Sequence, residues 1–259
     1  MTQTGKKHVD KKLNILWLWP DILNLHGDRG NVMALTRICG LYGIDAKITR
    51  MNRLTDDVPI GGADIIIMGA GELAVMPQIV SAMSMFAAEL RRFTDRGGVL
   101  LATGTTGAAL AVETIRNTGK ASYGLGLLDI ECRERQEPLG DDLIIKTKDT
   151  MTIYGSQIQM MDVKLSSGQE PFGETVYGYG NNGNGTEGAR SGNIIYTNAL
   201  GPLLVKNPWL TVELINLALS HKTKDSQLLS FDPALFELEL ASAEAIRKFN
   251  AAKEKPKWL

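Results

Sequence analysis

Residues 99–107 have the pattern of a turn that presents a nucleophile, but they contain no serine or cysteine. The apolar run Val99-Leu100-Leu101-Ala102 predicts a short buried strand. Thr103-Gly104-Thr105-Thr106-Gly107 predicts a sharp turn into an apolar helix that begins near Ala108. Many α/β hydrolytic enzymes hold a serine or cysteine on such a turn, where backbone amides and a helix N-terminus face the substrate. The sequence places Thr103 at the tip.

Composition excludes several other kinds of chemistry. The chain of 259 residues is 44% hydrophobic, so it can bury one large core or two modest ones. A net charge of -1 creates no global field that would attract nucleic acid or an acidic membrane. Cys39 and Cys132 give neither metal-ligand spacing nor a disulfide framework. We therefore expect no metal site and no cofactor.

The N-terminal residues 1–12 are polar and rich in lysine, without the apolar stretch of a secretory signal. No apolar run is long enough to cross a bilayer. We expect a disordered tail over residues 1–12 and a cytoplasmic protein.

Strand and helix signals alternate along the first half of the chain, as in α/β folds. Strands are expected at 13–19, 44–50, 64–68 and 99–102, with helices at 32–42 and from the turn Gly69-Ala70-Gly71-Glu72 to about Thr94. Shorter strands are expected at 143–148, 151–154, 174–178 and 193–197, with a closing helix at 208–220.

A further helix is expected beyond Pro233, because apolar residues recur there at helical spacing. The stripe consists of Leu235, Leu238, Ala241, Ala245 and Phe249. This helix could pack on the body or on a partner, and packing on the body is the favoured alternative. Residues 222–259 are accordingly expected to form a C-terminal helical extension.

Four segments together carry a family resemblance. They are residues 19–31, which end in Asp28-Arg29-Gly30-Asn31; residues 124–129; residues 178–188, which include Asn181-Asn182; and residues 201–208, which begin Gly201-Pro202. In this order and spacing they resemble the signatures of the cobyric-acid-synthase-like (CobB/CobQ-type) class I glutamine amidotransferases. More narrowly, they resemble the amidotransferase subunits of lipid II isoglutaminyl synthases. The similarity runs from about residue 13 to residue 221.

The resemblance implies an α/β fold of the class I amidotransferase (flavodoxin-like) type over residues 13–221, with a sheet flanked by helices. It also implies a cysteine nucleophile, activated by a histidine, that attacks the side-chain amide of glutamine. Ammonia then passes to a partner, here a Mur-ligase-like, ATP-dependent synthetase. The chemistry needs a thiolate, an imidazole that moves the proton, and backbone amides that hold the oxyanion.

This chain departs from the family at the positions that do chemistry. Alignment on the motifs places Thr103 at the nucleophile and Leu200, just before Gly201-Pro202, at the histidine. Glu137 falls near an arginine that the family uses to capture glutamine. The former oxyanion and substrate pocket then comprises Gly69, Ala70, Gly71, Gly104 and Glu137. A threonine hydroxyl needs a strong base, and leucine cannot carry a proton.

The sequence therefore predicts a degenerate amidotransferase-like subunit that holds or regulates a synthetase in cell-wall precursor metabolism. Two alternatives remain open: an active subunit that supplies ammonia for amidation of D-glutamate in lipid II, and a small-molecule sensor that uses the old glutamine pocket. Simpler structural roles are also open. Thr103, Thr105 and Thr106 could cap the following helix, and Cys39 and Cys132 could be ordinary core residues.

Overall fold

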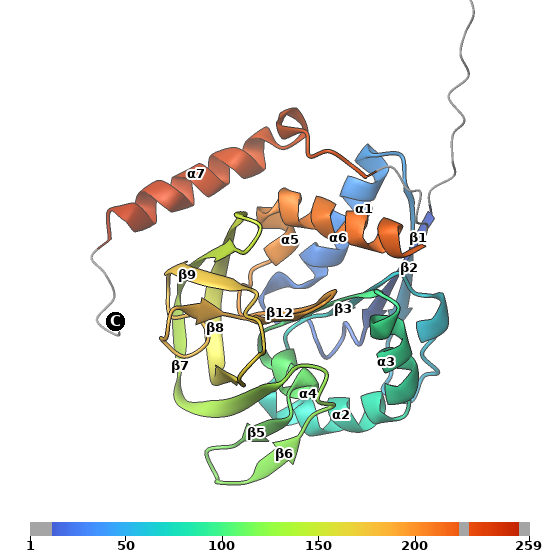
Figure 1. The fold of residues 1–259 in the computed structure, drawn as a ribbon, viewed down its shortest axis with the longest axis vertical. Coiled ribbons are helices and arrows are strands. Elements are labelled where there is room, and N and C mark those ends of the chain that lie inside the picture. The colour runs from blue at the N-terminus through green and yellow to red at the C-terminus, as the bar shows by residue number, and fades with distance from the viewer. Residues whose placement is uncertain (1–11, 223–227, 254–259) are drawn as a thin grey trace, which may run out of the picture.

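The computed structural model describes residues 12–222 and 228–253 (Figure 1). Apart from Lys12, the tail expected at residues 1–12 lies outside them. The strands are β1 (Lys12–Leu18), β2 (Asp45–Met51), β3 (Ile65–Met68), β4 (Val99–Thr103), β5 (Glu113–Ile115), β6 (Ala121–Tyr123), β7 (Ile130–Thr147), β8 (Thr152–Leu165), β9 (Gly173–Tyr177), β10 (Thr186–Glu187), β11 (Ala189–Ser191) and β12 (Ile194–Thr197). The α-helices are α1 (Arg29–Leu41), α2 (Met76–Ser84), α3 (Ala87–Asp95), α4 (Gly107–Leu110), α5 (Leu203–Lys206), α6 (Pro208–Lys222) and α7 (Glu237–Ala251).

A six-stranded sheet in the order β11-β12-β4-β3-β1-β2 forms the centre of the fold. All its neighbours pair in parallel except β11 and β12, which are antiparallel. The residues of β3 and β4 are all buried, as expected for central parallel strands covered on both faces. The predicted class I amidotransferase-like α/β fold is confirmed.

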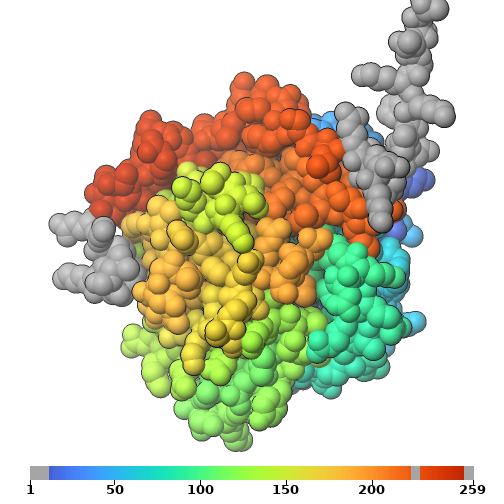
Figure 2. Space-filling model, in the orientation of Figure 1, coloured from blue at the N-terminus to red at the C-terminus, as the bar shows by residue number. Residues whose placement is uncertain are grey.

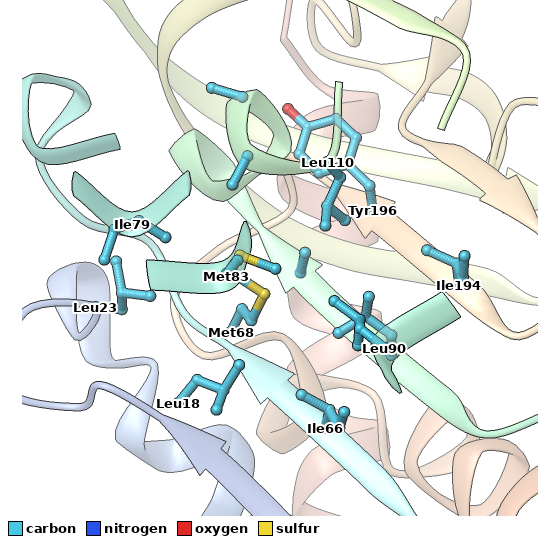
Figure 3. Packing of buried hydrophobic residues seen from close by; sticks show 14 of the residues in the cluster. Leu18, Leu23, Ile66, Met68, Ile79, Met83, Leu90, Leu110, Ile194 and Tyr196 are labelled. Carbon is cyan, nitrogen blue, oxygen red and sulfur yellow. The ribbon is translucent and has the colours of Figure 1, made fainter. Parts of the chain in front are cut away.

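Alternate residues of the central strands face two separate apolar clusters, because side chains alternate across a strand. On one face, Ile65, Ile67 and Leu101 pack with side chains of α1, α5 and α6. On the other, Ile66 and Met68 pack with side chains of α2, α3 and α4, as Figure 3 shows. The sheet therefore holds its carboxyl-terminal strand ends rigidly between two helical layers.

The helix expected to run to Thr94 is divided into α2 and α3. The two are bent by 80° at a short break, and Met83 and Leu90 on either side of it are both buried. Within the described residues no single helix is long and apolar enough to cross a membrane, although this bent pair passes a test of length and composition alone.

A second mixed sheet lies beside the first and extends further than the sequence predicted. Its order is β10-β9-β7-β5-β6, and β8 pairs with β7. The hairpin of β7 and β8 has strands of 18 and 14 residues, whereas only their adjoining ends were predicted. The remainder of the hairpin contains polar residues such as Arg133, Glu134 and Arg135, so its sequence lacks the apolar pattern of a strand. Such residues are compatible with a strand because one face of an antiparallel ribbon can remain in solvent.

The C-terminal helix α7 does lie on the body, but through residues other than the predicted stripe. Ala243 packs with Ile144 and Tyr154, and the ion pair of Arg37 with Glu239 (3.1 Å) anchors the first turns. The stripe itself faces outward. The prediction identified the helix correctly but not the face that contacts the body.

Helix α1 approaches the start of α5 closely because residue 30 has no side chain. A Cβ on Gly30 would lie 2.5 Å from Cγ of Pro202, which is far inside van der Waals contact. Gly40, in the same helix, has open space around it. Gly30 is therefore needed for the close contact with Pro202, whereas no packing contact requires a glycine at position 40.

We predict opposite effects on stability for alanine at these two positions. Gly30→Ala should lower the free energy of unfolding by about 1–3 kcal/mol through overpacking against Pro202. Gly40→Ala should raise it by roughly 0.5–1 kcal/mol through helix propensity alone. Chemical denaturation of both variants measures this, and equal effects would contradict the packing argument.

Candidate functional site

The tip of the strand-turn-helix segment is Gly104, not Thr103. Thr103 is the last residue of β4 and is extended, with φ −125° and ψ 141°. Gly104 follows it with φ +59°, in the left-handed region that side chains with a Cβ rarely adopt. A nucleophile elbow holds its reactive residue in such a strained conformation. The expectation that Thr103 occupies the tip is therefore wrong by one residue.

Leu200, the position expected to carry the base, meets Gly104 at the tip rather than Thr103, the residue expected to stand for the nucleophile. A Cβ on Gly104 would lie 3.3 Å from Cδ2 of Leu200 and 3.0 Å from Cβ of Ala70. Gly104 has no side chain, and Leu200 is 1% exposed. The space of a catalytic pair is thus filled by a leucine side chain.

Thr103 points instead toward Asp28, at the start of α1. Its hydroxyl donates to Oδ1 of Asp28 (2.9 Å), and the same oxygen accepts from the side-chain amide of Asn31 (3.2 Å). Oδ2 of Asp28 accepts from the backbone N–H of Ala70 (2.8 Å). Burial raises the pKa of Asp28 to about 7, against the opposing effect of its hydrogen bonds from Ala70 and Thr103.

The backbone donors of the turn 69–71 are already engaged. The N–H of Ala70 binds Asp28, and the N–H of Gly71 donates to the hydroxyl of Thr105 (3.0 Å). That hydroxyl in turn donates to the carbonyl of Gly71 (2.6 Å). An oxyanion hole needs donors that are free to face the developing charge. The amides of Ala70 and Gly71 do not have that freedom here.

None of the three threonines caps the helix through its side chain, so that expectation is also wrong. Thr103 binds Asp28, Thr105 binds Gly71, and Thr106 donates to the carbonyl of Thr103 (2.8 Å). Helix α4 is a single turn of four residues rather than the longer apolar helix expected.

The opening and C-terminal motifs form one packed unit. Oδ1 of Asn31 accepts from the N–H of Leu204 (2.8 Å), and Gly30 lies against Pro202. Gly201 has φ +78°, which glycine adopts without strain. Arg29 is exposed and contributes its backbone N–H to the side chain of Asn24 (2.8 Å). The motifs thus hold the site together mainly through Asp28, Asn31 and the glycine–proline contact.

The loop around Asn181-Asn182 is anchored from within. The side chain of Asn181 binds both the N–H and the carbonyl of Gly188 (2.9 Å each). Its backbone carbonyl accepts from Gln159 on β8. The Asn182 side-chain oxygen is buried and has no hydrogen-bond partner among residues 12–222 and 228–253.

Two buried groups escaped the sequence analysis. Glu187 accepts from the hydroxyl of Thr197 (2.7 Å) and from the backbone of Asn198 (2.6 Å), and burial raises its pKa. Gln157 and Gln159 of β8 hydrogen-bond to each other on the buried face of this strand. The partners of Glu187 come from a separate strand, so residue spacing gives no signal for that cluster, whereas the i, i+2 spacing of Gln157 and Gln159 places both on one face of β8.

Glu137 does not join the former pocket, contrary to expectation. It is exposed, within the register shift between Glu134 and Leu139 where β7 departs from regular pairing with β8. It lines an open hollow of about 630 Å³ together with Arg116 and Arg135. Gly69, Ala70, Gly71 and Gly104, by contrast, are all buried.

Neither cysteine offers a replacement nucleophile. Cys39 and Cys132 are buried, and burial raises the pKa of each thiol to about 12. Across residues 12–222 and 228–253, no group of three or more His, Cys, Asp or Glu side chains could hold a metal ion.

Comparison with known proteins finds similarity to two curated relatives over most of the chain. The chain is 26% identical over 248 residues to the lipid II isoglutaminyl synthase (glutamine-hydrolyzing) subunit GatD of Streptococcus pneumoniae, covering 94% of this chain and 93% of the relative. It is 27% identical to subunit GatD of Staphylococcus aureus, covering 82% and 86%. The chain is a homologue of the GatD subunits. No family model matches it.

Solved structures place this GatD homologue among glutamine amidotransferases by fold. A glutamine amidotransferase crystal structure superimposes with a TM-score of 0.52 at 19% identity, covering 78% of this chain and 98% of that one. PurLQS from Thermotoga maritima superimposes with a TM-score of 0.54 at 13% identity, covering 83% and 100%. The predicted recognition is confirmed.

We predict that Asp28 makes the stability of the GatD homologue depend on pH. Its folded-state pKa of about 7 lies above the unfolded value near 4, so between these values the folded state binds more protons than the unfolded state. The free energy of unfolding should therefore fall as pH rises from about 4 to 7, by up to about 1.4 kcal/mol per pH unit from this group.

Denaturation of the wild type and of Asp28→Asn at pH 5, 6 and 7 isolates this contribution, because other buried carboxyls such as Glu187 titrate in both proteins. The stability of the wild type relative to Asp28→Asn should decline over this range. A constant difference would show that Asp28 keeps an ordinary pKa.

Proposed function

We propose that this chain is a degenerate amidotransferase-like subunit that does not hydrolyse glutamine. In this proposal it acts as a structural or regulatory partner of a Mur-ligase-like, ATP-dependent amidating synthetase in cell-wall precursor metabolism. The observation that carries the proposal is the pairing of Gly104 with Leu200, buried, at the position where covalent catalysis needs a nucleophile and a base.

The expected decrease in the rate of glutamine hydrolysis supports a role without catalysis. Removing the nucleophile or base of a catalytic triad typically lowers the rate by ~10^4- to 10^6-fold. Here both are absent from the turn, and the amides of Ala70 and Gly71 are bound by Asp28 and Thr105. The nucleophile and the base of the family mechanism are thus replaced by residues that cannot react, and these two amides, which could hold the oxyanion, are engaged elsewhere.

The homology to GatD supports the proposal that this chain works with a synthetase partner. Its relatives are named as subunits of lipid II isoglutaminyl synthase, so they work within an assembly. This chain keeps the packed unit of Asp28, Asn31 and Pro202 while the catalytic positions have changed. A scaffold that remains intact without its chemistry is consistent with a contact role, in which free ammonia or another amine supplies the nitrogen.

A glutaminase assay tests the proposal. The purified chain, alone and with its co-purifying synthetase, should release no ammonia from glutamine above the enzyme-free rate. Turnover that disappears in Thr103→Ala but persists in Thr36→Ala, a change at an exposed threonine of α1, would instead establish an active subunit.

A second prediction tests which residue occupies the nucleophile position. In Gly104→Cys/Leu200→His, the new thiol should lie beside an imidazole and ionise below the ordinary cysteine pKa of about 8.5. In Thr103→Cys/Leu200→His, the thiol should face the carboxyl of Asp28 and remain protonated at that pH. Thiolate absorbance near 240 nm reports the new group alone, because Cys39 and Cys132 have a pKa of about 12.

We expect neither double variant to hydrolyse glutamine, because the amides of Ala70 and Gly71 stay engaged. A lowered thiol pKa in the Thr103 variant but not in the Gly104 variant would reverse the assignment of the tip. Restored glutaminase in the Gly104 variant would show that only the catalytic pair had been lost.

A further inference from the structure

Helix α7 presents an apolar stripe to solvent. Leu238 is 84% exposed and Phe249 is 61% exposed, and Ala241 and Ala245 are exposed between them. The helix runs along the rim of the molecule (Figures 1 and 2), and within the described residues the Lys253 ammonium lies 4.6 Å from the ring centre of Phe249. A surface helix ordinarily turns its apolar stripe toward a core. Here that arrangement is reversed.

The reversal is not a consequence of weak anchoring. The inner face is held by Ala243 in a small apolar cluster, by the ion pair of Glu239 with Arg37, and by Lys253 with Asp142 (3.1 Å). Because α7 is anchored on its inner face, the outer apolar stripe is a fixed surface of the molecule. Contiguous exposed apolar side chains of this kind usually mark an interaction surface.

The stripe has a symmetric order of side-chain sizes. Along the line at its centre, which includes the exposed Ser242 and leaves Ala241 to one side, the residues run large, small, small, large: Leu238, Ser242, Ala245, Phe249. If a second α7 lies antiparallel across it, with a two-fold axis between residues 243 and 244, Leu238 of each copy meets Phe249 of the other. Ser242 then meets Ala245. Small residues at the centre let the helix axes approach, and large ones fill the ends.

The charges beside the stripe favour the same orientation. At 100° per residue, Glu237 and Lys248 lie on the same flank, one near each end of the helix, and Lys248 also forms an exposed pair with Glu244 of its own helix (3.5 Å). In an antiparallel pair the matching flanks face each other, so Glu237 of each copy lies near Lys248 of the other. A parallel pair leaves these opposite charges at opposite ends. The pattern is therefore complementary to itself in one direction only.

We propose that α7 is a self-association surface through which two copies of this chain pair antiparallel about a two-fold axis. The contact is isologous, since the same patch serves both copies. It lies outside the buried turn at Gly104 and does not depend on what that turn does.

Sedimentation of the full chain over a range of concentrations tests the proposal. The wild type should show a monomer–dimer equilibrium, and Leu238→Glu and Phe249→Glu should each weaken it at least tenfold. Met85→Glu is the matched control, because Met85 is 78% exposed outside α7. It should leave the dimer unchanged. Circular dichroism of each variant checks that the fold is retained.

Cysteine cross-linking tests the orientation. Under mild oxidation Leu238→Cys/Phe249→Cys should form a disulfide-linked dimer, whereas either single variant should not. Residues 238 and 249 are about 16 Å apart along one helix, too far for a disulfide within one chain. The native cysteines are buried and should contribute little background.

Exchange of the flanking charges gives a third readout. Glu237→Lys should weaken the dimer, and Glu237→Lys/Lys248→Glu should restore it. A chain that stays monomeric at 100 µM, a dimer insensitive to Leu238→Glu, or a disulfide in the single variants would each overturn the proposal. So would binding of α7 to a synthetase partner in place of a second copy.

Discussion

The carboxyl group of Asp28 is the contact on which the candidate site depends. It accepts hydrogen bonds from the turn after β3 through Ala70, from the end of β4 through Thr103, and from α1 through Asn31. Asn31 in turn binds the start of α5. Residues up to 75 positions away thus bind this one buried carboxyl directly, and Asn31 links it to Leu204, which lies 173 residues further along the chain. Because its burial raises its pKa to about 7, this arrangement is stabilised by a group that is only partly ionised near neutral pH.

The same network bears on the proposal that this chain keeps an amidotransferase-like architecture without its chemistry. In an amidotransferase the turn at the end of the central strand must be strained, open to substrate and lined with free amides. Here Gly104 removes the strain that a side chain would cause, Leu200 fills the space in front of it, and Thr105 binds an amide of the facing turn. Each change replaces a reactive or solvated group by a packed or hydrogen-bonded one. Ala70, Gly104 and Leu200 are accordingly buried as part of the core.

The structure also separates two surfaces that the sequence could not distinguish. The hollow on β7 and β8 is lined by ion pairs that satisfy one another, such as Arg116 with Glu134. On the outer face of α7, the apolar stripe stays largely exposed within the described residues, although Lys253 lies over the ring of Phe249. Apolar surface left uncovered on an anchored helix is the more informative of the two, since water cannot satisfy it as it satisfies a charge.

Local patterns in the sequence determined the alternation of strands and helices, the existence of α7, the resemblance to amidotransferase subunits, and the lack of a serine or cysteine in residues 99–107 and of a histidine at position 200. These follow from residue type and periodicity, which act over a few neighbouring positions. Only the tertiary structure decided that Gly104 rather than Thr103 is the tip, because the deciding quantity is a backbone angle in a turn. Partners distant in the chain likewise decided that Thr103 binds Asp28, that Glu137 lies apart from the site, and that the stripe on α7 faces outward. Periodicity identifies an apolar face, but what covers that face depends on packing between elements that the sequence does not place side by side.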